Sequence, residues 1–118
     1  MSVVFSQDRK VGLADALARL TAPSVENASV EVFRHGMLRV KIYTPFGRDP
    51  QLPHSRDEVY VVARGRGVYI NGTTRMQVSA GDLLFAAAGE LHRFEGFSTD
   101  FAVWVFFYGP EGGEGSGR

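Results

Sequence analysis

Residues 29–108 form a succession of short apolar runs, and most of the turns between them contain glycine. The runs are SVEVFRHGMLRVKIYTP, which Gly36 divides in two, then EVYVVAR, GVYI, TTRMQVS, DLLFAAA, HRFEGF and FAVWVFFY. Several runs alternate apolar and polar residues, which is the period of a strand with one buried face. Asn71-Gly72 is the strongest hairpin signal, and the GRG sequence at 65–67 predicts another tight hairpin turn. The pattern predicts about eight strands in a sandwich, a jelly roll or a small barrel.

A different period precedes the strands. In DRKVGLADALARL, residues 8–20, apolar side chains recur at helical spacing from Leu13 to Leu20. Asp8 is suited to cap the start of a helix, and the APS sequence that follows is suited to stop one. We therefore predict one short amphipathic helix over residues 8–20.

The length of the chain indicates a single domain, because 118 residues can bury one core but are too few for two. We expect this domain to span residues 1–110, with the strands at 29–108. The C-terminal GPEGGEGSGR offers no apolar residue for packing, so we expect residues 111–118 to form a flexible tail.

The composition excludes several classes of site and partner. Thirteen basic residues balance thirteen acidic ones, which argues against nucleic-acid and membrane partners. The absence of cysteine removes disulfides, thiolate nucleophiles and cysteine metal sites, and leaves His, Asp and Glu as the strong ligands. No stretch approaches the ~20 apolar residues that span a bilayer, and the first residues lack the pattern of a signal peptide. We expect a soluble, cytoplasmic protein.

His54 and Glu58 stand just before an apolar, β-branched run in PHSRDEVYVVARG. On a straight strand these two residues would lie ~13 Å apart, which is too far for one metal ion to bind both. The sequence PHSRDE has the composition of a bend, however, with a proline followed by Ser, Arg and Asp. A bend between the two residues would bring them to a shared metal.

A second histidine, His92, follows another strand and another break. Gly81-Asp82 is a turn signal ahead of the run LLFAAA, and Gly89 interrupts the chain just before His92. Two imidazoles and one carboxylate are ligands that several first-row divalent metals accept. We therefore regard His54, Glu58 and His92 as a candidate metal site.

The sequences HSRDEVYVVARGRG and GDLLFAAAGELHRF resemble the two motifs of the cupin superfamily, and the likeness extends over residues 34–108. In the first motif, His54 corresponds to the second histidine, Glu58 to the glutamate and Gly65 to the final glycine. The position of the first histidine is occupied by Leu52. The first motif is therefore incomplete.

The second motif is matched by Gly81, Gly89 and His92. Ala87 stands where the family has a proline, and Gly96 stands where it has an asparagine. The resemblance implies an all-β double-stranded β-helix, a jelly-roll barrel whose mouth holds a divalent metal such as iron, manganese, nickel or zinc. It also implies that His54, Glu58 and His92 bind that metal.

Several other side chains are candidates for the ligand pocket. Because Glu58 points inward in the family, the period of two along a strand turns Tyr60 inward as well. Most of the aromatic residues should fill the barrel, as in other barrels of this size. We expect Tyr60, Gln51, Tyr43 and Trp104 to line the pocket.

Leu52 lacks a lone pair and cannot replace the histidine whose position it occupies. Gln51 is the first candidate for a substitute ligand, followed by Asp49. The motif register predicts that Leu52 faces the metal, so that Leu52→His should tighten metal binding by about tenfold.

Each proposed ligand also has a purely structural interpretation. His54 would then be a solvated loop histidine, and Glu58 a strand-entry carboxylate paired with one of the arginines, a kind of pair that contributes little when exposed. His92 would be a half-buried histidine bonded to a backbone carbonyl.

The resemblance implies metal-dependent oxygenation or isomerisation of a small organic molecule in the barrel mouth. The alternative is a non-catalytic binding or sensory module, with or without metal, and a third possibility is a scaffold for protein interaction. The run FAVWVFFY is apolar on both faces, and such a strand must be covered on both sides. One short helix is too small for this, so we predict a homodimer.

Overall fold

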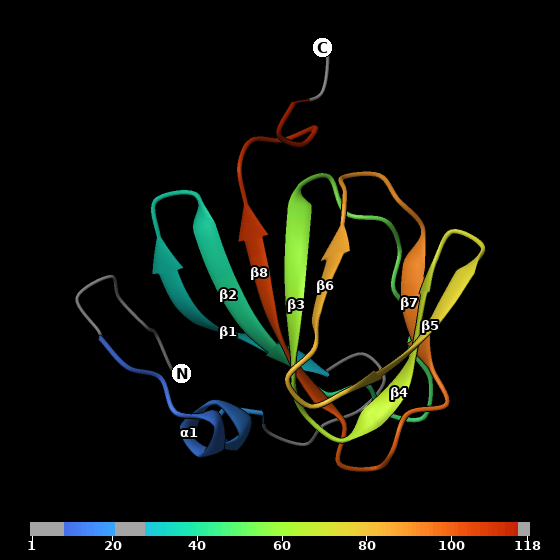
Figure 1. The fold of residues 1–118 in the computed structure, drawn as a ribbon. Helices are drawn as coiled ribbons and strands as arrows, with labels where there is room; N and C mark the ends of the chain where they lie inside the picture. Colours follow the sequence, from blue (N-terminus) through green and yellow to red (C-terminus); the bar gives the residue numbers. More distant parts are fainter. Residues whose placement is uncertain (1–8, 21–27, 116–118) are drawn as a thin grey trace.

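A computed structural model describes residues 9–20 and 28–115 of the chain. Within these ranges there is one helix, and eight strands form two sheets (Figure 1). The elements are α1 (Leu13–Ala18), β1 (Ser29–His35), β2 (Leu38–Tyr43), β3 (Asp57–Arg64), β4 (Arg66–Asn71), β5 (Thr74–Ser79), β6 (Leu83–Ala86), β7 (His92–Glu95) and β8 (Ala102–Tyr108). In the described part of the chain, no helix is long and apolar enough to cross a membrane.

The two sheets enclose the main core. The larger sheet has the strand order β1-β2-β8-β3-β6 and the smaller one the order β5-β4-β7, and neighbouring strands within each sheet are antiparallel. Strands of both sheets contribute buried side chains to one cluster, among them Tyr43, Tyr60, Val62, Tyr69, Val78, Leu84, Phe94, Val103 and Val105. This arrangement confirms the predicted all-β double-stranded β-helix.

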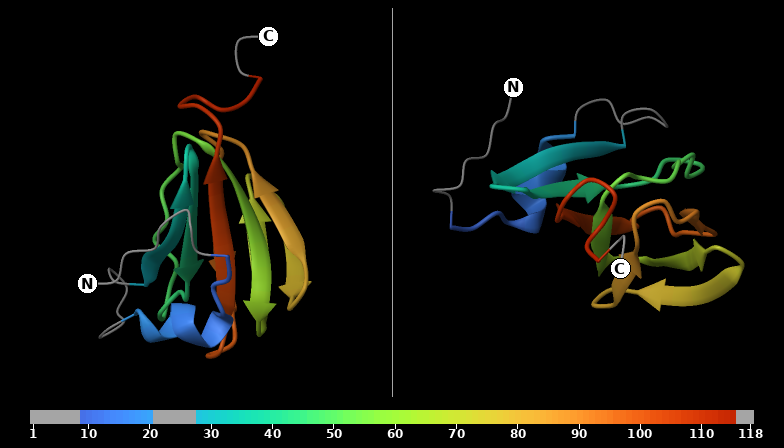
Figure 2. Two further views of the ribbon diagram at one scale, coloured as in Figure 1. Left: turned by 90° about the vertical axis from the view of Figure 1, so that its left-hand side faces the viewer. Right: turned by 90° about the horizontal axis from the view of Figure 1, so that it is seen from above.

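The helix α1 is shorter than the sequence predicts. It begins at Leu13, because Gly12 has an extended backbone with a φ of −74° and a ψ of 152°, and no side chain caps it. Asp8, the predicted cap, lies outside the described residues. Leu13 and Leu17 pack with the buried Ala16 against the outer face of the larger sheet. The helix lies beside β1 and β2, far from the smaller sheet (Figures 1 and 2).

The outer face of the larger sheet is apolar across most of its width. On β8, Val103 and Val105 point into the barrel, while Trp104 and Phe106 belong to the outer cluster. The strand register aligns two apolar rows across the sheet, which are Ile42, Trp104, Val61 and Leu83, and Val40, Phe106, Val59 and Phe85. The side chains at the β6 end of these rows are largely exposed.

Two predicted turns have different outcomes. β4 and β5 pair as a hairpin through Gly72, which has a φ of 61°, as Asn71-Gly72 predicts. The predicted hairpin at Gly65 is wrong, because β3 and β4 belong to different sheets. Gly65 has a φ of 80°, and its Cα is so close to Ser98 and Phe101 that a Cβ would clash with them. The chain therefore uses this glycine to pass from one sheet to the other.

The described part of the C-terminal tail is held against the barrel rather than free. The N–H of Gly112 donates to the carbonyl of Ser55 (2.7 Å), and the N–H of Glu114 donates to the Asp57 carboxylate (2.7 Å). Gly113 is buried in this contact. Backbone groups thus anchor residues 111–115, which the sequence predicts to be flexible, and residues 116–118 lie outside the described part.

Candidate metal centre

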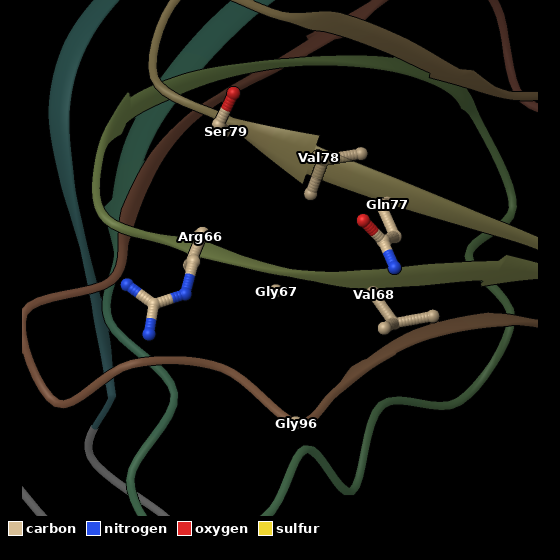
Figure 3. A pocket seen from close by; sticks show the side chains of 7 residues that line it. All are labelled: Arg66, Gly67, Val68, Gln77, Val78, Ser79 and Gly96. Atoms are coloured by element: carbon tan, nitrogen blue, oxygen red, sulfur yellow. The ribbon is translucent and has the colours of Figure 1, made fainter.

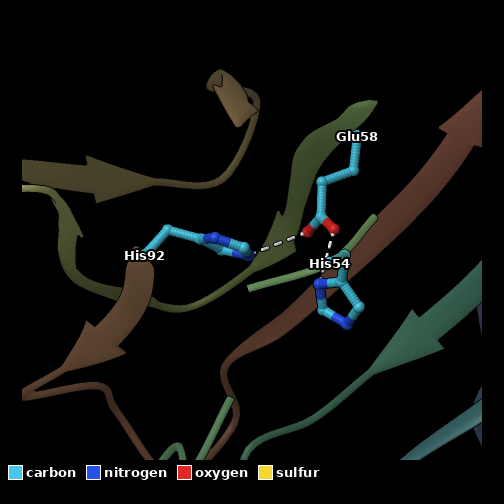
Figure 4. Close-up of side chains that lie close together, drawn as sticks. All are labelled: His54, Glu58 and His92. Carbon is cyan, nitrogen blue, oxygen red and sulfur yellow. Dashed lines mark hydrogen bonds and ion pairs between the residues drawn. The ribbon is translucent and has the colours of Figure 1, made fainter. Parts of the chain in front are cut away.

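His54, Glu58 and His92 come together at one end of the barrel (Figure 4). His54 Nδ1 lies 2.8 Å from Glu58 Oε2, and His92 Nε2 lies 3.0 Å from Glu58 Oε1. One ligand atom from each residue lies within 4.8 Å of those of the other two. The side chains of Glu58 and His92 are each 1% exposed and that of His54 is 38% exposed, so solvent reaches the cluster from the His54 side.

The local sequence explains why three residues from separate segments meet. The chain bends at Ser55 and Arg56, between His54 and β3, as the composition of PHSRDE predicts. Glu58 then enters β3 with its side chain directed into the barrel. Gly89 has a φ of 83°, and its N–H donates to the carbonyl of His54 (2.8 Å). This bond joins the loop before β3 to the loop before β7, where His92 is the first strand residue.

The imidazole of His92 is fixed by hydrogen bonding on its far side. Its Nδ1 lies 2.9 Å from the carbonyl oxygen of Glu90, which can only accept, so Nδ1 must carry a proton. If the ring is neutral, Nε2 then presents a lone pair to the Glu58 carboxylate. Two lone pairs 3.0 Å apart repel, so the site requires either a proton or a metal cation between them. An imidazole whose other nitrogen donates to a carbonyl is typical of metal ligands.

The contact between His54 and Glu58 points to the same requirement. Although His54 Nδ1 and Glu58 Oε2 lie 2.8 Å apart, their orientation makes no hydrogen bond, and both atoms are buried without another partner among the described residues. Buried polar atoms of this kind are rare, because each loses its hydration without compensation. A cation between these atoms would satisfy both, so the three residues fit a metal ion.

Burial and close contact shift the pKa values of Glu58, His92 and Tyr60. Burial acts to raise the pKa of the Glu58 carboxyl, but His54 and His92 outweigh it and hold this pKa at about 2. Burial acts to lower the pKa of His92, yet the Glu58 carboxylate and the Glu90 carbonyl raise it above its ordinary value. Burial and the charge of Glu58 raise the pKa of Tyr60 well above its ordinary value. Glu58 is therefore an anion at neutral pH, while Tyr60 keeps its proton.

The candidate pocket residues form two groups. The hydroxyl of Tyr60 donates to Gln51 Oε1 (2.9 Å), and Gln51 Nε2 donates to Asp49 Oδ2 (2.7 Å). The hydroxyl of Tyr43 donates to the other oxygen of Asp49. Trp104, by contrast, packs in the outer cluster of the larger sheet. Its position in β8 alternates with that of the inward Val103 and Val105, so the structure does not bring Trp104 to the mouth.

Leu52 does not face the three residues, contrary to the motif register. Its side chain is 76% exposed, and it is not among the residues that cluster with Glu58. Gln51, the proposed substitute ligand, has both ends of its amide in hydrogen bonds to Tyr60 and Asp49. Among the described residues, the group that could hold a metal consists of His54, Glu58 and His92.

The supporting roles of two residues, Asp49 and Phe107, were not expected from the sequence. The buried Asp49 carboxylate accepts hydrogen bonds from Tyr43, from Gln51 and from the backbone N–H of Phe94 (2.7 Å), so it ties the loop before β3 to β7. The ring of Phe107 packs edge-on against that of His54, with centroids 5.1 Å apart. The alternation of β8 was a signal for Phe107, whereas nothing local distinguished Asp49 from a loop aspartate.

A hollow that does not involve these three residues lies elsewhere on the barrel. It has a volume of about 450 Å³ and is lined by Arg66, Gly67, Val68, Gln77, Val78, Ser79 and Gly96 (Figure 3). None of the three clustered residues lines this hollow. The candidate metal centre is therefore separate from it.

Comparison with known proteins identifies the family to which the sequence is similar. Residues 40–108 match the family model described as "Cupin domain". An uncharacterized protein of Streptomyces coelicolor is 41% identical over 63 residues, which are 53% of this chain and 60% of that protein. The alignment thus spans less than two thirds of the relative's length.

Solved structures show the same fold. A cupin-2 domain containing protein from Shewanella frigidimarina superposes with a TM-score of 0.67 at 13% identity, over 81% of this chain and 91% of that one. The TT1209 protein from Thermus thermophilus superposes with a TM-score of 0.62 at 25% identity, over 80% and 95% of the two chains.

Proposed function

The chain belongs to the cupin family, and from this premise we propose that it holds one divalent metal ion with His54, Glu58 and His92 and binds a small organic molecule beside it. The observation that carries the proposal is the arrangement around Glu58. One of its oxygens lies 3.0 Å from His92 Nε2, the nitrogen opposite the proton-bearing Nδ1, and the other lies unbonded beside His54 Nδ1. A divalent cation at this point satisfies all of these atoms.

The ligand set leaves several metals possible and leaves coordination positions open. Imidazole and carboxylate accept iron, manganese, nickel and zinc, and geometry rather than ligand type selects among them. When bound, the metal supplies Lewis acidity toward an oxygen-bearing molecule. Glu58 contributes the negative charge that offsets the cation, and the Glu90 carbonyl orients the ring of His92.

The activity that we propose for this site is metal-dependent oxygenation or isomerisation of the bound molecule. Three protein ligands leave room for further ligands on the metal. Tyr60 is held in its protonated form beside Glu58, so it is suited to donate a hydrogen bond and unsuited to act as a base. Phe107 and the half-exposed face of His54 shape the approach from solvent.

A non-catalytic binding or sensory module is the second candidate. It is favoured by the hydrogen bonds of Tyr60 and Gln51, which commit both side chains to each other and to Asp49. Turnover of a bound molecule in the metal-loaded protein separates the two candidates, because a binding module returns the molecule unchanged.

The metal proposal is tested by competition against a chromophoric chelator near pH 7.5, where ordinary imidazoles are mostly neutral. We expect one tight site in the wild type and a loss of at least about tenfold in affinity in His92→Ala, because one of three ligands is gone. His35→Ala is the matched control, since His35 is an exposed residue at the end of β1. Equal affinities for the wild type and His92→Ala would contradict the proposal.

A further inference from the structure

A pocket of about 210 Å³ opens beside His54, on the side from which solvent reaches the candidate metal centre. We call it the cationic pocket, and it is lined by Arg39, Lys41, His54, Ser55, Arg56, Phe107 and Glu111. Arg39 and Lys41 lie two residues apart on β2, so their side chains share one face of the strand. That face also carries Tyr43, which points into the barrel.

The charges in the cationic pocket are only partly compensated. Arg39 is paired with Glu31, with the closest nitrogen and oxygen 2.6 Å apart. The guanidinium of Arg56 donates to the backbone carbonyls of Gly109 and Met37, which leave its positive charge uncompensated.

Lys41 and Glu111 complete the balance of charge. Lys41 has no ion pair within residues 9–20 and 28–115. Glu111, from the C-terminal tail, is the carboxylate in the lining. Because Arg39 is already paired with Glu31, the two uncompensated cations Lys41 and Arg56 face one carboxylate in the lining, that of Glu111.

We propose that the cationic pocket binds the anionic group, carboxylate or phosphate, of a small organic molecule. Lys41 and Arg56 supply the charge, and the ring of Phe107 provides an apolar wall next to His54 for the carbon skeleton. This inference names the ligand class of the proposed metal site and so rests on the proposed function for its biological meaning. The attraction between the pocket and an anion, however, does not depend on the metal.

Glu111 provides a second test of the proposal, because its negative charge opposes anion binding. Its carboxylate lies on the tail that the backbone bonds to Ser55 and Asp57 hold in place, so it stays at the rim of the pocket. An incoming anion is repelled by it. Removing this charge should strengthen anion binding, whereas removing the charge of Lys41 should weaken it.

The test is calorimetric titration of malonate and, separately, of inorganic phosphate into the full-length protein at low ionic strength. The protein is used both as purified and after treatment with a chelator. We expect Lys41→Met to weaken binding of the preferred anion by about tenfold, which corresponds to about 1.4 kcal/mol, and Glu111→Gln to tighten it several-fold. Lys10→Met is the matched control, because it removes the same charge outside the pocket.

The outcomes distinguish the two proposals. If malonate binds more tightly than phosphate, the ligand carries a carboxylate; if phosphate binds more tightly than malonate, the ligand carries a phosphate. Binding of neither anion at millimolar concentration, or equal effects of Lys41→Met and Lys10→Met, would overturn the cationic pocket whatever the metal titration shows. Anion binding that weakens in Lys41→Met and tightens in Glu111→Gln, in a protein that has no affinity for metal, would support the pocket and contradict the proposed function.

Discussion

His92 and Glu58 show how single side chains define the site. The Glu90 carbonyl fixes the proton of His92 on Nδ1, and that bond directs Nε2 at the buried carboxylate. Burying an anion is costly unless it is paired, and Glu58 is 1% exposed. The arrangement is therefore stable only with a cation or a proton shared among the three residues.

Leu52 provides a prediction at this scale. Because its side chain is 76% exposed, we expect Leu52→His to leave the affinity for divalent metal unchanged within about twofold, less than the tenfold that one aligned donor could add. The measurement is the same chelator competition, with Leu52→Gly as the control. Tighter binding in Leu52→His but not in Leu52→Gly would return this side chain to the metal, as the motif register first predicts.

Elements rather than residues decide how the chain passes between the two sheets. β3 ends and β4 begins on either side of Gly65, yet the two strands pair with different partners. Only a residue without a side chain fits there, because a Cβ would lie 2.6 Å from Ser98 Oγ and 2.8 Å from the Cα of Phe101. The contact with Phe101 involves backbone, which cannot rotate away.

Two glycine substitutions test this role. Gly65→Ala should destabilise the protein by about 3 kcal/mol or more, because strain at positive φ is joined by a clash with backbone. Gly36→Ala is the matched control, since Gly36 also has a positive φ (57°) but nothing within 4 Å of its Cβ position, and should cost about 1 kcal/mol. The free energies come from urea unfolding, and equal losses would show that the close approach at Gly65 is unimportant.

The sequence predicted the strands better than their arrangement. Short apolar runs between glycine-containing turns identified all the strands, and the bend in PHSRDE and the position of His92 followed from local turn signals. The crossing at Gly65 could not be distinguished from a hairpin, because both require the same glycine conformation. The anchored tail also depends on distant partners, since Ser55 and Asp57 receive its backbone N–H groups.

The candidate site shows the same division. The donor residues were found from motif spacing, whereas the side of the sheet on which Trp104 lies depends on the phase of β8 relative to the barrel. Asp49 was considered only as a substitute ligand, because its bonds to Tyr43 and to the backbone of Phe94 join segments far apart in the sequence.

For the whole molecule, the outer face of the larger sheet raises the question of what covers it. α1 packs at the β1–β2 side, with Leu13 and Leu17 in the outer cluster. At the other side, Leu83 is 66% exposed and Phe85 is 47% exposed. A groove of about 410 Å³, lined largely by apolar side chains, including Trp104, lies between the two sides.

We expect a second copy of the chain to cover this face, because β8 is apolar on both of its faces. Light scattering at micromolar concentration should give twice the chain mass of 13.0 kDa. Phe85→Glu should shift the protein toward the monomer, because it places a charge in the apolar row. Leu91→Glu is the control, since Leu91 is exposed in the loop before β7. A monomeric wild type would contradict the prediction.

The central claim is that His54, Glu58 and His92 hold one metal ion, and anomalous diffraction from crystals grown with zinc or manganese tests it most directly. We predict a single strong anomalous peak about 2.0–2.3 Å from His54 Nδ1, His92 Nε2 and a carboxylate oxygen of Glu58, with His92 Nδ1 still bonded to the Glu90 carbonyl. The account would be contradicted if the crystals contained metal but showed no anomalous peak at this position, with Glu58 still bonded directly to His92.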